Sequence, residues 1–274
     1  MPARLAPFLL AAFALLAAPA AAQTQPAPPW IETGPEVDVA LVLAVDISYS
    51  MDLEEQALQR EGYVAALTSP AVIDAIRKGM VGRIAVTYLE WAGVATRNIV
   101  VDWTIIEDER SARAFADQLK AAPIRRARRT SVSNAIDFGM DRLHATNLRA
   151  IRRVIDISGD GPNNEGAPVT RARDRALAAG VIINGLPVVL DRGYRSSFDI
   201  EGLDEYFEDC VIGGPGAFMI AVVDRAQFAD AIRAKILREV AQNGQSDLPA
   251  APRRRARADC LIGEKLWRQN WERN

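Results

Sequence analysis

The sequence is poor in the residues that carry most enzyme and metal chemistry. Its 274 residues include one histidine, His144, and two cysteines, Cys210 and Cys260. One histidine and two cysteines cannot form a His-rich zinc site, and serine–histidine catalysis could use only His144. Chemistry in this chain therefore depends mainly on the oxygen atoms of Asp, Glu, Ser, Thr and the backbone.

The chain also lacks an excess of either charge. It has 33 basic and 35 acidic residues, which gives a formal net charge of -2. A globally basic nucleic-acid-binding protein is therefore excluded. The content of 49% hydrophobic and 25% charged residues is that of an ordinary globular protein, so disorder is excluded as the main state.

Residues 1–22 are predicted to be a secretory signal peptide. Arg4 supplies a positive charge, residues 5–16 are mostly apolar, and the segment ends in Ala20, Ala21 and Ala22, which are typical of a cleavage site. The apolar run is too short for a membrane span, and no other stretch approaches that length. We expect cleavage near Ala22, export to the periplasm or the outside of the cell, and a proline-rich spacer over residues 23–35.

Export changes the interpretation of the two cysteines. In an oxidising compartment two cysteines are expected to form a disulfide, with two free thiols as the alternative. Cys210 and Cys260 are 50 residues apart. A bridge across a loop of that length removes loop-closure entropy from the unfolded chain, which corresponds to about 4 kcal/mol.

The hydrophobic pattern predicts one α/β domain over residues 36–243. A continuous apolar run at residues 39–45 is typical of a strand buried on both faces. Strands then alternate with helical patterns, which predicts a doubly wound, mostly parallel sheet with helices on both faces. A short link predicts one antiparallel edge strand. The predicted strands are 39–45, 84–91, 98–103, 153–157, 181–190 and 217–223, and the main predicted helices are 53–67, 111–121, 132–143, 170–179 and 225–243.

Residues 244–274 are predicted to be a linker and a C-terminal tail. The linker is polar and rich in proline and arginine, and the tail carries Trp267 and Trp271 one helical turn apart. Side chains at this spacing share one helix face, so we expect the tail to pack back against the domain.

Oxygen-bearing side chains gather at the predicted ends of strands. Asp46, Ser48 and Ser50 follow the 39–45 strand at alternate positions, which puts all three on one side of an extended segment. Thr130 stands at a predicted helix start, and Asp160 lies in the turn after another strand. Ligands of open α/β sheets bind at such strand ends, and these oxygens suit a hard divalent cation.

These residues resemble the von Willebrand factor A domain and its metal-ion-dependent adhesion site. The resemblance covers about residues 36–243 and is closest to exported bacterial members of unknown function. It implies a Rossmann-like fold in which Ser48, Ser50 and Thr130 contact the metal directly, while Asp46 and Asp160 act largely through bound water. Two arginines precede Thr130 where the family usually has glycine, so two alternative third hydroxyls are Ser131 and Ser133.

The expected function is binding rather than catalysis. Neutral hydroxyls leave a bound cation with positive charge, which an Asp or Glu of a partner protein can neutralise. Magnesium is the first expectation, with manganese or calcium as alternatives. One rival hypothesis is a magnesium-dependent phosphohydrolase with Asp46 as nucleophile, although the chain has only four lysines and Ser48 replaces the second acid. Another rival is a metal-free interaction scaffold.

Two further expectations concern charged residues outside this set. Asp156 lies inside a predicted strand, so it is expected to be a structural residue with a backbone or helix partner. The four arginines before Thr130 either rim the site or form a solvated loop. These arginines are Arg125, Arg126, Arg128 and Arg129.

Overall fold

The computed structural model describes residues 30–190, 199–241 and 258–272. The predicted signal peptide and most of the predicted spacer and linker lie outside the described residues. Within the described part of the chain, every helix is too short or too polar to cross a membrane.

The sheet has five strands in the order β3-β2-β1-β4-β5. Central strand β1 pairs in parallel with β2 and β4, β4 pairs in parallel with β5, and β2 pairs antiparallel with β3. The predicted α/β architecture and the antiparallel edge strand are therefore confirmed. The strands are β1 Glu36–Asp46, β2 Ile84–Trp91, β3 Arg97–Ile106, β4 Arg149–Gly159 and β5 Ile182–Pro187.

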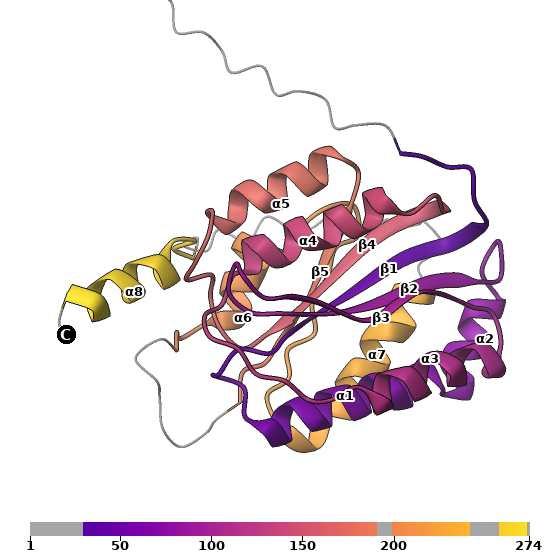
Figure 1. The fold of residues 1–274 in the computed structure, drawn as a ribbon, viewed down its shortest axis with the longest axis horizontal. Coiled ribbons are helices and arrows are strands. Elements are labelled where there is room, and N and C mark those ends of the chain that lie inside the picture. The colour runs from indigo at the N-terminus through magenta and orange to yellow at the C-terminus, as the bar shows by residue number, and fades with distance from the viewer. Residues whose placement is uncertain (1–29, 191–198, 242–257, 273–274) are drawn as a thin grey trace, which may run out of the picture.

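Helices cover both faces of the sheet (Figure 1). Leu41 and Leu43 of β1 pack into the layer that contains α1, α2, α3 and α7, while Ala40 and Val42 pack against α4, α5 and α6. Each face of β1 is therefore buried, as its apolar run predicts. The helices are α1 Leu53–Leu67, α2 Pro70–Arg77, α3 Glu109–Ala121, α4 Val132–Ala145, α5 Val169–Ala178, α6 Leu203–Tyr206, α7 Phe228–Ala241 and α8 Ile262–Glu272, with a π-helical turn η1 Phe207–Val211 and a 3-10 turn η2 Arg225–Gln227.

The prediction of a regular last strand at residues 217–223 is wrong. The segment lies beside β5, where Gly185 N donates to Phe218 O and Ile220 N donates to Gly185 O. The next donor in a parallel ladder would be Pro187, which has no N–H. Pairing resumes beyond it, where Val222 N donates to Pro187 O, so only isolated bridges form.

A buried charged cluster connects α7 to the sheet. Lys235 Nζ of α7 lies 3.0 Å from Asp156 Oδ1 of β4 and 3.2 Å from Glu239 Oε1. All three side chains are at most 1% exposed, and Asn184 Nδ2 of β5 donates to Glu239 Oε1 at 2.8 Å. Burial raises the pKa of Asp156 to about 6, although the charge of Lys235 lowers it. The expectation of a helix partner for Asp156 is confirmed.

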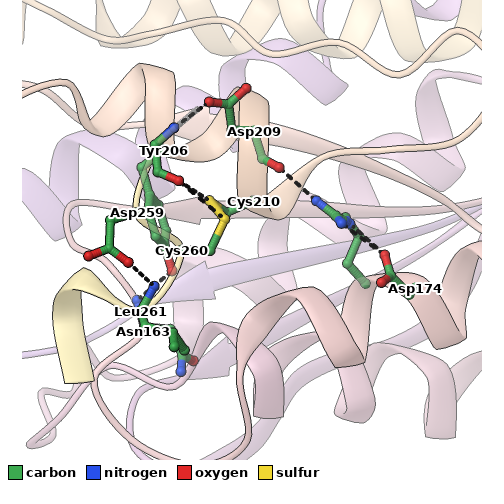
Figure 2. The surroundings of a disulfide bond; sticks show 10 residues. Asn163, Asp174, Tyr206, Asp209, Cys210, Asp259, Cys260 and Leu261 are labelled. Atoms are coloured by element: carbon green, nitrogen blue, oxygen red, sulfur yellow. Dashed lines mark hydrogen bonds and ion pairs between the residues drawn. A yellow bond between two sulfur atoms is a disulfide. The ribbon is translucent and has the colours of Figure 1, made fainter. Parts of the chain in front are cut away.

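The predicted disulfide between Cys210 and Cys260 is present (Figure 2). It joins η1 to Cys260, two residues before the start of α8, with a Cα–Cα distance of 5.5 Å. Asp209 Oδ2 accepts a hydrogen bond from Ala258 N at 2.6 Å, which ties the same two segments together. The tail therefore begins at a fixed point on the domain.

Removing this disulfide is expected to lower the free energy of unfolding by about 2–4 kcal/mol, because the unfolded chain regains loop entropy. The change is Cys210→Ser with Cys260→Ser, measured by urea unfolding with and without a thiol reductant. Reductant should destabilise the wild type and leave the double variant unchanged. Equal unfolding midpoints for the oxidised wild type and the variant would contradict the expectation.

Candidate metal centre

The predicted oxygen ligands gather at the carboxyl ends of β1 and β4. These two strands are parallel neighbours, with Val45 opposite Ser158, so Asp46 and Asp160 emerge at the same edge. The strand order reverses at this point, because β2 pairs with one side of β1 and β4 pairs with the other. Such a switch point is where open α/β sheets bind ligands.

Hydrogen bonds connect four of the five predicted residues. Asp46 Oδ1 accepts a bond from Ser48 N at 2.7 Å. The Ser48 and Ser50 hydroxyl oxygens are 2.8 Å apart, and the Ser50 hydroxyl donates to Asp160 Oδ1 at 2.6 Å. Hydrogen bonds therefore connect the two aspartates through the two serines, with the backbone N–H of Ser48 making the bond to Asp46.

Thr130 lies at the same edge and is held by Asn164. Thr130 N donates to Asn164 Oδ1 at 3.0 Å, and Thr130 O accepts a bond from Asn164 N at 2.8 Å. A methyl group on Gly161 would lie 4.0 Å from the Thr130 hydroxyl oxygen. The hydroxyl thus faces the turn that carries Asp160. The sequence shows Asn164 only as a turn residue, and its positioning role becomes visible in the structure.

The two alternative hydroxyls face a later part of the loop between β4 and α5, at residues 165–166. Ser131 is the N-cap residue of α4, and its hydroxyl donates to Glu165 O at 2.8 Å. The Ser133 hydroxyl lies 3.4 Å from that of Ser131, and both lie close to Gly166. These contacts engage the hydroxyls of both serines with residues 165–166.

The backbone explains why an arginine can precede Thr130. Arg129 has φ 74° and is the one non-glycine residue with positive φ in the described ranges. This left-handed region favours glycine, the residue more usual here in the family that the sequence resembles. Arg129 therefore keeps a glycine-like backbone and adds a guanidinium group.

The Asp46 carboxyl group is in an unfavourable position for an anion. Its side chain is fully buried, and Oδ2 has no hydrogen-bond partner among the described residues. Burial raises the pKa of Asp46 well above its ordinary value, and the negative charge of Asp160 raises it further. A cation at this edge would compensate both carboxylates.

The candidate ligands combine carboxylate and hydroxyl oxygens and do not form a cluster of several acidic side chains. Within the described residues, no group of three or more His, Cys, Asp or Glu side chains could hold a metal ion. Two carboxylates supplemented by neutral hydroxyls fit a hard cation such as magnesium, which retains several bound waters. The residues present therefore fit a divalent cation.

The fold of this chain is that of von Willebrand factor A domains. Solved structures with this fold include a von Willebrand factor type A protein from Catenulispora acidiphila, at 15% identity and TM-score 0.53, covering 75% of this chain and 43% of that one. The chain itself belongs to the family described as "Protein of unknown function (DUF1194)", which matches residues 36–244. A comparison with curated proteins found no match.

Two other solved structures with a similar fold are a bacterial pilus adhesin and a mussel byssus protein. The pilus adhesin SpaC from Lactobacillus rhamnosus GG, in its open conformation, is 14% identical with TM-score 0.54, covering 76% of this chain and 30% of that one. Proximal thread matrix protein 1 from the mussel byssus is 10% identical with TM-score 0.51, covering 73% and 47%. This chain thus spans less than half the length of each, and these similarities show the fold alone.

Proposed function

We propose that this chain is an exported protein-binding module that holds a divalent cation at the strand ends. Through the cation it binds an acidic side chain of a partner protein. The ligands are Asp46, Ser48, Ser50, Thr130 and Asp160, with magnesium as the first expectation and manganese or calcium as alternatives. Export rests on the sequence of residues 1–22, and the pilus adhesin of the same fold is consistent with a protein-binding role.

The observation that carries this proposal is the buried Asp46 carboxyl beside Asp160. A protein gains no stability from two close acids, one of them with an unpartnered buried oxygen. Such groups are favourable once a cation is bound. We propose Thr130 as the third hydroxyl because it faces the Asp160 turn, whereas the Ser131 hydroxyl is committed to Glu165 O.

Binding rather than catalysis is the function that this donor set supports. Hydroxyl ligands leave positive charge on the cation, and a carboxylate from outside can complete its coordination. The phosphohydrolase hypothesis needs an accessible Asp46 and a lysine near it, but Asp46 is fully buried and Lys235 is paired with Asp156.

Calorimetric titration of the mature protein, the chain without residues 1–22, tests the proposal. We expect Mg²⁺, Mn²⁺ or Ca²⁺ to bind and to stabilise the fold, by about 2.7 kcal/mol at a free metal concentration of 100 times Kd. N-acetyl-glutamate amide should then bind only to the metal-loaded protein. Sodium chloride at matched ionic strength is the control. Absence of both binding heat and stabilisation with all three metals would rule the proposal out.

A further inference from the structure

A groove of about 440 Å³ lies next to the metal centre, between α8 and the loop that holds Thr130. We propose that this groove, here called the tail groove, binds an acidic segment of the partner protein next to the carboxylate that coordinates the metal. The inference rests on the proposed function and adds the chemistry of the partner. The residues that line the tail groove include Arg129, Asn164 and Glu165 on the domain and Trp267, Arg268 and Trp271 on α8.

The tail groove adjoins the metal centre because α8 is anchored to the residue beside Asn164. A methyl group on Gly263 would lie 2.1 Å from Asn163 O, so the α8 backbone packs directly on this loop. Glu264 Oε1 accepts a hydrogen bond from Asn163 Nδ2 at 2.7 Å. Asn164 in turn holds Thr130. One residue of the loop thus contacts the tail, and the next contacts the centre.

An arginine-rich segment, residues 125–129, runs along the centre toward the tail groove. Ala127 N donates to Ile47 O at 2.9 Å, which aligns the segment with the Asp46–Ser50 loop. At one end the Arg126 guanidinium lies 5.1 Å from the Tyr49 ring centre, and at the other the Arg129 guanidinium lies 3.2 Å from the Trp267 ring centre. The segment therefore lies between an aromatic side chain of the domain and one of the tail.

The charges on this face favour a negative ligand. Arg125, Arg128 and Arg268 are exposed, and none of them forms an ion pair with an acid of the described chain. The two acids that line the groove already accept hydrogen bonds from the protein: Glu165 Oε2 accepts one from Val94 N at 2.8 Å, and Glu264 Oε1 accepts one from Asn163 Nδ2 at 2.7 Å. An acidic segment would supply the missing counter-charges.

The aromatic surface of α8 favours a peptide over an isolated anion. The side chain of Trp271 is 75% exposed, although it lies on the groove. Peptide recognition commonly pairs such exposed aromatic rings with arginines, because the rings contribute apolar area and the arginines bind carboxylates. The groove volume suits a few side chains rather than a large ligand.

The test compares two probes on the Mg²⁺-loaded mature protein, namely hexaglutamate and N-acetyl-glutamate amide. We expect hexaglutamate to bind more tightly, and Arg268→Gln to weaken it by about 2- to 5-fold, the effect of an exposed ion pair. Lys265→Gln is the matched control, because Lys265 is on the same helix but pairs with Asp259 outside the groove. Neither variant should change the affinity for Mg²⁺ or for the single-carboxylate probe.

A second variant displaces the helix without removing a charge. Gly263→Ala places a methyl group against backbone, so α8 must shift, and hexaglutamate affinity should fall about tenfold, the sum of a few exposed pairs. Equal effects of Arg268→Gln and Lys265→Gln, or tighter binding of single-stranded DNA than of hexaglutamate, would overturn the acidic-segment proposal while Mg²⁺ binding persists. Loss of Mg²⁺ binding in the wild type would overturn the proposed function as well.

Discussion

Replacing Asp46 with asparagine is expected to stabilise the metal-free protein and to abolish its stabilisation by divalent cations. The substitution keeps the side-chain shape and the acceptor for Ser48 N, but it removes a buried charge whose Oδ2 has no partner in the described structure. It also removes the repulsion from Asp160 that raises the pKa of Asp46. A residue that is costly to the empty fold and required for ligand binding is typical of a functional site.

Thermal unfolding in EDTA and in excess Mg²⁺ measures both effects. The wild type should gain about 2.7 kcal/mol at 100 times Kd, and Asp46→Asn should gain nothing. Asp38→Asn is the matched control on the same strand, where the carboxylate accepts bonds from Val81 N and Gly82 N at 2.9 Å. The Asp38→Asn variant should be less stable than the wild type by the same amount in EDTA and in excess Mg²⁺. An Asp46→Asn protein that still gains stability from Mg²⁺ would place the cation elsewhere.

Replacing Lys235 with methionine is expected to lower the free energy of unfolding by about 3–5 kcal/mol at neutral pH, because two acids lose their buried counter-charge. Asp156 lies 3.0 Å from the lysine Nζ, and Glu239 lies 3.2 Å from it. Methionine fills most of the volume, so the loss reports the missing charge rather than a large cavity. Urea unfolding measures the change, and Lys120→Met, which alters an exposed lysine at the end of α3, should change stability by less than about 0.5 kcal/mol.

The loss caused by Lys235→Met should depend on pH in a defined direction. The pKa of Asp156 is about 6 in the folded wild type, above the ordinary value of 3.8, and removal of Lys235 raises it further. When the pKa of an acid is higher in the folded state than in the unfolded state, the free energy of unfolding decreases as pH rises from the unfolded pKa to the folded pKa. The variant should therefore be closer to the wild type at pH 5 than at pH 7.5. A difference that is the same at both pH values would show that the Asp156 charge is not its cause.

Much of the fold could be predicted because local patterns and burial agree. The apolar run at residues 39–45 is typical of a strand covered on both sides, and β1 is the central strand. The short α2 was not predicted, although Ser69 caps it and Pro70 starts it, which is a known helix-start signal. The strand predicted at residues 217–223 failed because its regularity depends on the neighbouring Pro187 rather than on its own apolar sequence.

The sequence predicts more of the candidate metal centre than of the tail groove. Asp46, Ser48 and Ser50 are close in sequence, and parallel strand ends bring Asp160 to them by topology alone. The choice between Thr130 and the adjacent serines depends on side-chain direction, which the sequence does not specify. The contact of Arg129 with Trp267 depends on the path of the tail, and only the structure shows that path.

The disulfide has a consequence for when the binding face is complete. Cys210 and Cys260 can be joined only where thiols are oxidised, so under the proposed export the newly made chain reaches that condition after it leaves the cytoplasm. Before then α8 is held by noncovalent contacts, including those of Gly263, Glu264 and Trp267, without a covalent anchor. Formation of the disulfide thus adds a covalent anchor to the side of the face that carries Arg129 and Trp267, whereas the proposed cation ligands come from the ends of β1 and β4 and from the residue two positions before α4. We therefore expect the proposed binding of acidic partners to be weaker before this bond forms than after it.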